Sequence, residues 1–123
     1  MARSTRSQLA TYERRYRELA EQVAEIGFIS SGTVTRRYTT CSSAGCRCHA
    51  DPPQRHGPYY QWTTKTAGKT RTRRLTRNEA KLYTEWIGND RRLRKVIQQM
   101  RQIAAKAAEL KLTEATDSAA PKV

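Results

Sequence analysis

The sequence predicts an α+β protein in which two long antiparallel, coiled-coil-like helices flank a small three-stranded antiparallel β module stapled by a metal. Three observations support this fold class. Apolar residues recur at heptad spacing towards both ends of the chain, short runs rich in threonine, tyrosine and arginine lie between them, and every cysteine and histidine falls in that middle part. A length of 123 residues fits one domain over residues 1–123.

The composition leaves room for only a small hydrophobic core. Leu, Ile, Val and Phe together number 17 residues, or 14% of the chain. A fraction below ~20% in a highly charged chain is typical of disorder. A large enzyme-type core with a buried cleft is therefore excluded, and the chain needs a metal, a long helical seam or a partner chain to fold.

The N-terminal segment is predicted to form a helix over residues 5–26. Ser4 or Thr5 is expected to cap its start, and Gly27 suits the left-handed position just past its last turn. We expect this helix to be structural and to bury a single stripe. The apolar residues of that stripe, at strict heptad spacing, are Leu9, Tyr12, Tyr16, Leu19, Val23 and Ile26.

The C-terminal segment is predicted to form a longer helix over residues 77–112, followed by a flexible tail over 113–123. Thr76 and Glu79 have the spacing of a capping box. Asn89, a polar residue in the apolar stripe, would fix register or partner number; alternatively, Gly88–Asn89 is a bend between two helices. The heptad positions are Leu82, Trp86, Asn89, Leu93, Val96, Met100, Ile103, Ala107 and Leu110.

The difference in length between the two predicted helices suggests a dimer. At ~1.5 Å per residue the first spans roughly 33 Å and the second roughly 54 Å. In a hairpin, Ile26 would then lie near Leu82, and Ile103, Ala107 and Leu110 would lack a partner in the same chain. A homodimer through the C-terminal helix would cover them, unless this overhang frays.

The middle of the chain is predicted to hold three strands over residues 33–40, 59–65 and 69–75, within a module that spans 33–75. The last two strands are separated by Thr66-Ala67-Gly68, where glycine accommodates a positive φ. We expect the last two strands to form a β-hairpin.

A cluster of cysteine and histidine residues is predicted to bind zinc. Cys41, Cys46 and Cys48 are followed by His49 and His56, and the chain has no further cysteine or histidine. Three thiolates and one imidazole make a closed tetrahedral zinc site, which is structural because no position stays open for water. We prefer His56 to His49 as the fourth ligand, because His49 adjoins Cys48 and adjacent extended residues point to opposite sides. The alternatives are three reduced surface cysteines, or a thiol redox site that lacks the usual Cys-x-x-Cys motif.

These residues carry a resemblance to a known family. The matching parts are Cys41, Cys46-Arg47-Cys48, His56-Gly57-Pro58-Tyr59-Tyr60-Gln61-Trp62, Gly68-Lys69 and Glu85-Trp86-Ile87. Over roughly residues 15 to 100 the chain resembles short bacterial proteins catalogued as a domain of unknown function, some of them encoded near transposase or recombinase genes. The resemblance implies the same four metal ligands and an accessory or regulatory role with a mobile element. Ser42 departs from the family pattern, which has glycine after the first cysteine.

The excess positive charge concentrates in the middle of the chain. The formal net charge is +13, and residues 27–78 contain ten basic residues against the single acid Asp51. A basic two-stranded ribbon with polar tips suits a DNA major groove or a phosphate backbone, which makes DNA a more plausible partner than RNA. The predicted nucleic-acid-binding residues are Arg36, Arg37, Gln61, Lys65, Lys69, Arg71, Arg73, Arg74 and Arg77.

The sequence predicts a non-enzymatic nucleic-acid-binding protein. It contains no Ser-His-Asp set, no paired carboxylates in an apolar setting and no glycine-rich phosphate loop, so we expect no small-molecule substrate. The alternatives are a coiled-coil assembly protein that binds an acidic protein partner, or an RNA-binding protein in which Tyr59, Tyr60 or Trp62 stacks on bases. We expect no membrane association and a cytoplasmic location, because no apolar run resembles a transmembrane helix or a secretory signal.

Overall fold

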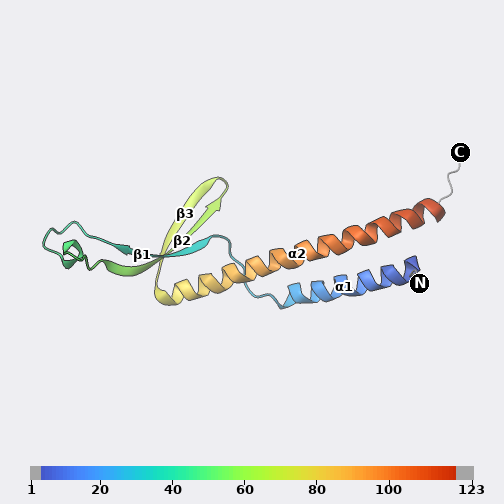
Figure 1. Cartoon of the computed structure of the whole chain (residues 1–123), viewed down its shortest axis with the longest axis horizontal. Helices are drawn as coiled ribbons and strands as arrows, with labels where there is room; N and C mark the ends of the chain where they lie inside the picture. Colours follow the sequence, from blue (N-terminus) through green and yellow to red (C-terminus); the bar gives the residue numbers. More distant parts are fainter. Residues whose placement is uncertain (1–3, 119–123) are drawn as a thin grey trace. The chain divides into compact units, whose positions relative to one another are not determined.

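The computed structural model describes residues 4–118 and has two long helices and a three-stranded antiparallel sheet (Figure 1). The predicted α+β class is confirmed at this level. The elements in chain order are α1 (Thr5–Glu25), β1 (Thr33–Thr39), the short 3₁₀ helix η1 (Arg47–His49), β2 (His56–Thr66), β3 (Lys69–Leu75) and α2 (Arg77–Ser118).

The described residues divide into two compact units. The helical unit contains residues 4–26 and 91–118, which are α1 and the C-terminal part of α2. The sheet unit contains residues 27–90, which are the strands, η1 and the first turns of α2.

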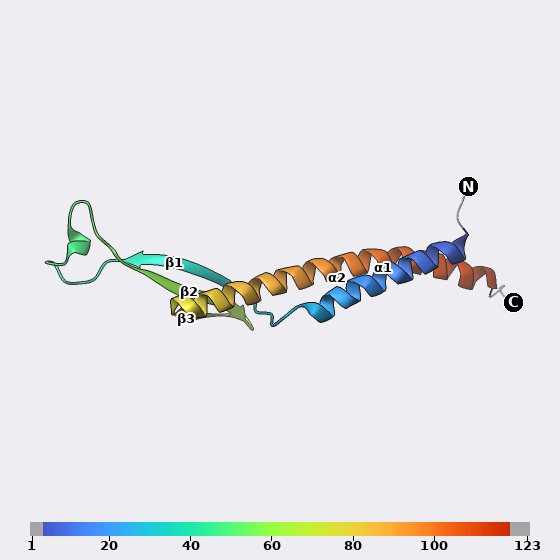
Figure 2. The same cartoon turned by 90° about the horizontal axis from the view of Figure 1, so that it is seen from below.

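In the helical unit, α1 runs antiparallel to the C-terminal part of α2 (Figure 2). The Oγ of Ser4 caps α1 by accepting a hydrogen bond from the backbone N–H of Ser7 at 3.1 Å. The prediction for Gly27 is wrong: Ile26 ends the helix in an extended conformation, and Gly27 is not among the residues with positive φ. A Cβ at Gly27 would lie 3.3 Å from the Nδ2 of Asn89, so a close approach to α2 favours glycine there.

The two helices pair further along α2 than the length argument predicted. Ile103 and Ala107, which were expected to lack a partner in the same chain, line one groove together with Tyr12 and Tyr16. The reason is the path of the segment that follows α1. The N–H of Ser30 in this segment donates to the carbonyl of Trp86, so the segment, and not α1, lies beside the first turns of α2. The heptad residue Leu82 is accordingly 47% exposed.

The long helix α2 is continuous through Gly88 and Asn89, so the predicted alternative of a bend there is wrong. It also extends through residues 113–118, which were predicted to be a flexible tail. Its last turns contain neither proline nor glycine, and the hydroxyls of Thr113 and Thr116 bond back to carbonyls four residues earlier. Residues 119–123 of the predicted tail lie outside the described residues.

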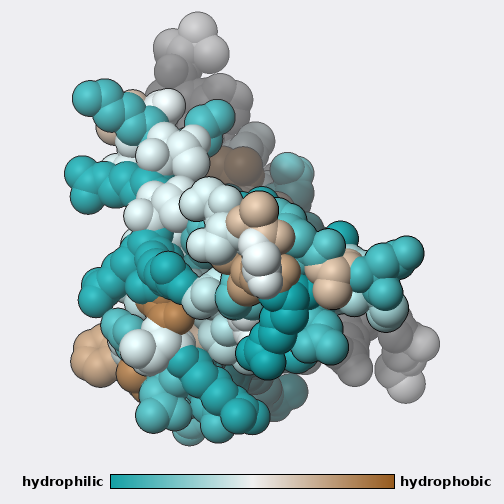
Figure 3. All heavy atoms as spheres, turned by 90° about the vertical axis from the view of Figure 1, so that its left-hand side faces the viewer, coloured by the Kyte–Doolittle hydropathy of each residue, from teal (hydrophilic) through white to brown (hydrophobic). Residues whose placement is uncertain are grey.

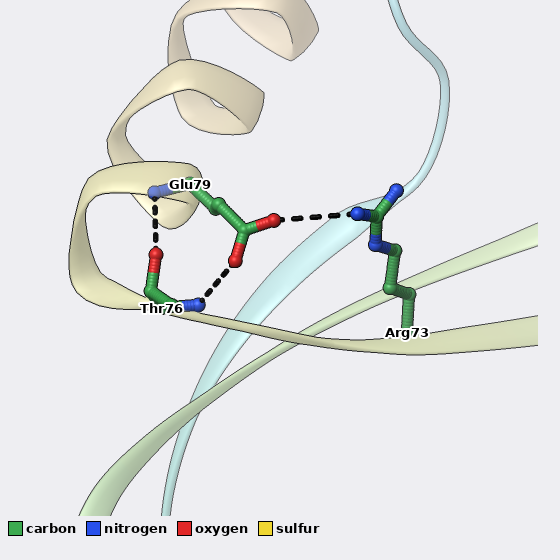
Figure 4. Close-up of polar contacts among 3 residues, drawn as sticks. All are labelled: Arg73, Thr76 and Glu79. Atoms are coloured by element: carbon green, nitrogen blue, oxygen red, sulfur yellow. Dashed lines mark hydrogen bonds and ion pairs between the residues drawn. The ribbon is translucent and has the colours of Figure 1, made fainter.

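A reciprocal capping box begins α2, as the sequence predicted (Figure 4). The N–H of Glu79 donates to the Oγ1 of Thr76 at 3.2 Å, and the N–H of Thr76 donates to the Oε1 of Glu79 at 3.0 Å. The second carboxylate oxygen of Glu79 pairs with Arg73 at 3.3 Å. These contacts join the end of β3 to the start of α2.

The sheet has the strand order β1-β2-β3, with all neighbours antiparallel. The predicted hairpin is confirmed: Ala67 and Gly68 connect β2 to β3 with φ values of 51° and 79°, the signs that a type I′ turn requires. β2 begins at His56, three residues before the predicted Tyr59, because His56 pairs with Thr39 of β1.

One face of the sheet packs against the first turns of α2 and forms the small core of the sheet unit. The ring of Trp62 lies 4.7 Å from that of Tyr83, which in turn lies 5.0 Å from Trp86. Leu75 at the end of β3 and Ala80 in α2 are also buried. Thr64 is also buried, with its hydroxyl hydrogen-bonded to that of Ser31 at 2.8 Å. We call this face of the sheet the covered face.

None of the described helices has an apolar stretch long enough to cross a membrane. Seen from the end of the sheet unit that carries the β1–β2 connection, the surface is mainly hydrophilic and its hydrophobic patches are small (Figure 3).

Candidate metal centre and basic sheet face

The loop between β1 and β2 brings together the four side chains that the sequence nominated as metal ligands. The Sγ atoms of Cys41, Cys46 and Cys48 and a ring nitrogen of His56 all lie within 4.8 Å of one another. Cys41 follows the end of β1, Cys46 and Cys48 flank the start of η1, and His56 is the first residue of β2. The sheet therefore fixes two of the four residues and the loop supplies the others.

The distances within the cluster suit a tetrahedral metal. The Sγ atoms of Cys41 and Cys48 are 3.6 Å apart, and the Sγ of Cys46 is 3.2 Å from the Nε2 of His56. Around a tetrahedral zinc ion with Zn–S near 2.3 Å, ligand atoms lie about 3.5–3.8 Å apart. Small adjustments would bring all four atoms to that spacing.

The backbone around the cluster favours negative charge on the sulfur atoms. A backbone hydrogen bond from Ser43, followed by hydrogen bonds from His56 and the other two thiols, lowers the pKa of Cys41 from 9.0 to about 6. The N–H of Cys41 approaches the Sγ of Cys48 at 3.4 Å and lowers the pKa of that thiol. Burial and the neighbouring thiols outweigh this contact, so the pKa of Cys48 lies above its ordinary value. A cation among the three sulfur atoms would offset the mutual repulsion of the thiolates.

The two histidines have different roles. His49 is exposed, and its Nε2 lies 2.6 Å from the carbonyl oxygen of Cys41, outside the four-residue cluster. His56 is held beside Cys46 by Gly57, whose φ of 130° favours glycine and where a Cβ would lie 2.7 Å from the carbonyl oxygen of Arg37. The geometry agrees with the preference for His56.

The cluster is built as a closed site. Cys48 is 1% exposed, the other three residues are half-buried, and the four residues offer the number of ligand atoms that a tetrahedral metal takes. A metal bound in this way has no position left for water or substrate. The arrangement suits a structural ion, which would tie the loop to the paired ends of β1 and β2.

The strand register divides the predicted nucleic-acid-binding residues between the two faces of the sheet. Residues paired across antiparallel strands lie on the same face. Trp62 pairs with Arg73, and Thr64 pairs with Arg71, so these two arginines lie on the covered face, as do Lys69 and Arg36. The sheet therefore does not bring the predicted set together on one surface.

The opposite face, which we call the outer face, gathers the remaining strand residues of the predicted set. Gln61 on β2 pairs with Thr35 on β1 and with Arg74 on β3, and Arg37 pairs with Tyr59. Towards the hairpin the outer face continues with threonines and one lysine, and it carries no acidic residue. These further residues are Thr33, Thr63, Lys65, Thr70 and Thr72.

Two contacts hold the charged side chains of the outer face in place. The guanidinium of Arg74 lies over the ring of Tyr59, with its central carbon 3.9 Å from the ring centroid. Arg37 reaches the Oε1 of Gln61 at 3.5 Å. Together with Thr39, Tyr60 and Thr72, these residues line a groove on the sheet. Tyr59 was missing from the predicted set, although its alternation with Gln61 was a usable signal.

On the covered face, two of the predicted arginines already have partners. Arg73 pairs with Glu79 of α2, and the Nη2 of Arg36 donates to the hydroxyl of Tyr38 at 2.7 Å. Arg77, the first residue of α2, is exposed. The ion pair to Glu79 distinguishes Arg73 from Arg37 and Arg74, whose contacts above are with uncharged side chains.

Comparison with known proteins places the chain in a family. No curated protein and no solved structure matches it. One family profile matches residues 9–84, so it begins and ends earlier than the resemblance over 15 to 100 suggested. The matched stretch contains the metal-ligand cluster and the whole sheet. The chain therefore belongs to the family described as Domain of unknown function (DUF6788).

Proposed function

We propose that the chain is a non-enzymatic nucleic-acid-binding protein whose sheet unit is stabilised by one zinc ion bound to Cys41, Cys46, Cys48 and His56. The proposal joins two features of the sheet unit, the metal-ligand cluster and the concentration of basic residues.

The observation that carries the binding proposal is the charge of the sheet unit. Within residues 27–78, Asp51 is the only acid against ten basic residues. Among the described residues, Glu79 of α2 offsets part of this positive charge by pairing with Arg73. A surface with this imbalance attracts polyanions, and phosphate contacts account for most of the affinity of nucleic-acid-binding proteins.

The metal would act on binding through folding. The described sheet unit buries only a few large side chains, among them Leu75. A structural zinc site contributes its binding energy to folding, on the order of 10 kcal/mol in small zinc peptides. The ion would hold β1 against β2, and β1 carries Arg37.

The test is a binding titration of the full metal-loaded chain. Fluorescence anisotropy with a labelled short duplex DNA should show binding that weakens linearly in log–log form as salt rises, about one unit of slope per phosphate contact. Poly-glutamate of similar charge serves as the control for an acidic protein partner. Preference for a nucleic acid over poly-glutamate supports the proposal, whereas equal binding of poly-glutamate, or no binding of duplex DNA or duplex RNA at low salt, rejects it.

A further inference from the structure

We infer that the outer face of the sheet, and not the basic hairpin as a whole, is the surface that binds nucleic acid, and that it reads the major groove of duplex DNA. The inference rests on the proposed function and specifies its binding site. It is based on a row of residues paired across the three strands, Thr35–Gln61–Arg74, with Arg37 and Tyr59 beside it.

The first argument is accessibility within the sheet unit. The covered face packs Trp62 against Tyr83 and engages Arg73 in an ion pair with Glu79. A duplex cannot lie flat on this face without displacing α2. Lys69 and Arg71 of the covered face are exposed as well, but Trp62 and Tyr83 hold α2 against the middle of that face. On the outer face, Arg37 and Arg74 are exposed and the side chains between them are short or uncharged.

The second argument is shape. Strands in a sheet lie ~4.8 Å apart, so three backbones span about 10 Å. The major groove of B-form DNA is about 12 Å wide and admits a two-stranded β-ribbon, and β-sheet readers also place strands in it. Threonines at Thr33, Thr63 and Thr72 form a row with short side chains across the sheet, which would let the backbone approach the floor of the groove.

The arginine and glutamine side chains of the outer face are distributed over all three strands. Arg37 lies on β1 and Arg74 on β3, the two outer strands, so each side chain starts from one edge of the sheet. In the structure both guanidinium groups lie over β2, beside Gln61 and Tyr59, and either could turn outward to a phosphate on its own side of a groove. Gln61 lies on the central strand, where an amide can contact base edges, adenine above all. Stacking on Tyr59 holds Arg74 in position before binding.

The same geometry discriminates against double-stranded RNA. The major groove of an A-form helix is deep and narrow, and protein side chains cannot read it. A flat sheet face with short side chains therefore fits B-form DNA and not A-form RNA. The inference commits to duplex DNA.

The experiment compares two double variants of equal charge, each in the full metal-loaded chain. Arg37→Ala with Arg74→Ala alters the outer face, and Lys69→Ala with Arg71→Ala removes two exposed charges from the covered face. We expect the outer-face variant to lose roughly tenfold or more in affinity for duplex DNA and about two units of salt slope. The covered-face variant should retain the affinity and slope of the wild type.

A second pair of variants guards against loss of folding. Thr72→Glu places a negative charge on the outer face, and Thr66→Glu places one on the covered face near the same hairpin. Only Thr72→Glu should abolish binding. Zinc content and circular dichroism equal to those of the wild type confirm that each variant is folded, and a charge-preserving Arg37→Lys, Arg74→Lys variant should keep the salt slope.

Each outcome bears on one of the two proposals. Equal losses in both double variants, or a larger loss on the covered face, overturn the outer-face site but leave nucleic-acid binding in place. Binding of duplex RNA as tight as that of duplex DNA overturns the major-groove assignment. A wild-type chain that binds no nucleic acid at low salt overturns the proposed function as well.

Discussion

The Nδ2 of Asn89 donates a hydrogen bond to the carbonyl oxygen of Phe28 at 2.8 Å. Asn89 is 7% exposed, and its partner is 61 positions away in the chain. This polar residue in the apolar stripe therefore anchors the segment between α1 and β1 to α2. We expect this contact within the chain, rather than the setting of coiled-coil register, to be the main role of Asn89.

Replacing Asn89 with leucine is expected to destabilise the protein by about 1–3 kcal/mol, because the Phe28 carbonyl loses its donor in a partly buried place. Urea denaturation of the metal-loaded protein measures the change. Light scattering should give wild-type and variant the same mass. A different mass for the variant would indicate instead that Asn89 sets the register of a coiled coil between chains.

Metal binding should distinguish the two histidines. Elemental analysis of protein purified without added metal should find about one zinc per chain. His56→Ala should lose the metal and the sheet signal in circular dichroism, because His56 supplies the fourth ligand atom. His49→Ala is the matched control and should keep the metal, since the His49 ring lies outside the four-residue cluster, with its Nε2 beside the carbonyl oxygen of Cys41. Equal metal loss in both variants, or a wild type that is folded without metal, would contradict this assignment.

The capping box should contribute measurably to stability. Thr76→Ala removes the hydroxyl that accepts the N–H of Glu79 and should cost about 1 kcal/mol of unfolding free energy. Thr76→Ser keeps the hydroxyl and should stay within a few tenths of a kcal/mol of the wild type. Thermal and chemical unfolding of the three proteins would show this order, and equal stability of the alanine and serine variants would speak against it.

The free energy of unfolding at acidic pH should depend on Glu79. The Thr76 backbone N–H, then the Thr76 hydroxyl, and then Arg73 hold the pKa of this carboxyl below its ordinary value of 4.5. A group whose pKa falls on folding stabilises the protein above its unfolded pKa, and this contribution is lost as the pH drops from 4.5 through the lower folded value.

Glu79→Gln keeps an oxygen that accepts the cap hydrogen bond but does not titrate. The wild type should therefore be the more stable of the two at neutral pH, and its advantage should shrink below pH 4.5. Metal release at low pH affects both chains equally and cancels in the difference. An advantage that is constant down to the acid limit would argue against the lowered pKa.

In the hairpin turn, we expect a substitution of Ala67 to stabilise the protein and a substitution of Gly68 to destabilise it. Ala67 has a φ of 51°, a left-handed conformation that suits asparagine better than alanine, so Ala67→Asn should raise stability by about 0.5–1 kcal/mol. Gly68 has a φ of 79°, and Gly68→Ala should lower stability by about 1 kcal/mol. Denaturation midpoints at constant metal content would test both, and a loss of stability in the asparagine variant would contradict this turn type.

What the sequence predicted well is local. The capping box depends on Thr76 and Glu79, three residues apart, and the hairpin on a two-residue turn. The metal-ligand cluster is also local, because Cys41 and His56 bracket a single loop between paired strands. In each case the physical cause lies within one helix cap, one turn or one loop of the chain.

What the sequence did not predict depends on contacts between distant segments. Alternation separates Arg71 and Arg73 from Arg74, but it does not say which set meets a helix; Trp62 packing on Tyr83 decides that. In the same way, heptad spacing identifies the stripes of α1 and α2 but not their pairing. That pairing depends on the path of the intervening segment beside Trp86.

The position of His56 in both the metal-ligand cluster and β2 has a consequence for strand pairing. β1 is polar and exposed along most of its length, and strands of this kind are prone to slippage. A slip of one residue would exchange the two faces of a strand, and Arg37 would leave the side of the sheet that carries Arg74. Because Cys41 lies just beyond the end of β1 and His56 pairs with Thr39, a bound ion would fix the two strands to each other at one end. The ion would therefore determine which side chains share a surface, and not only whether the chain folds.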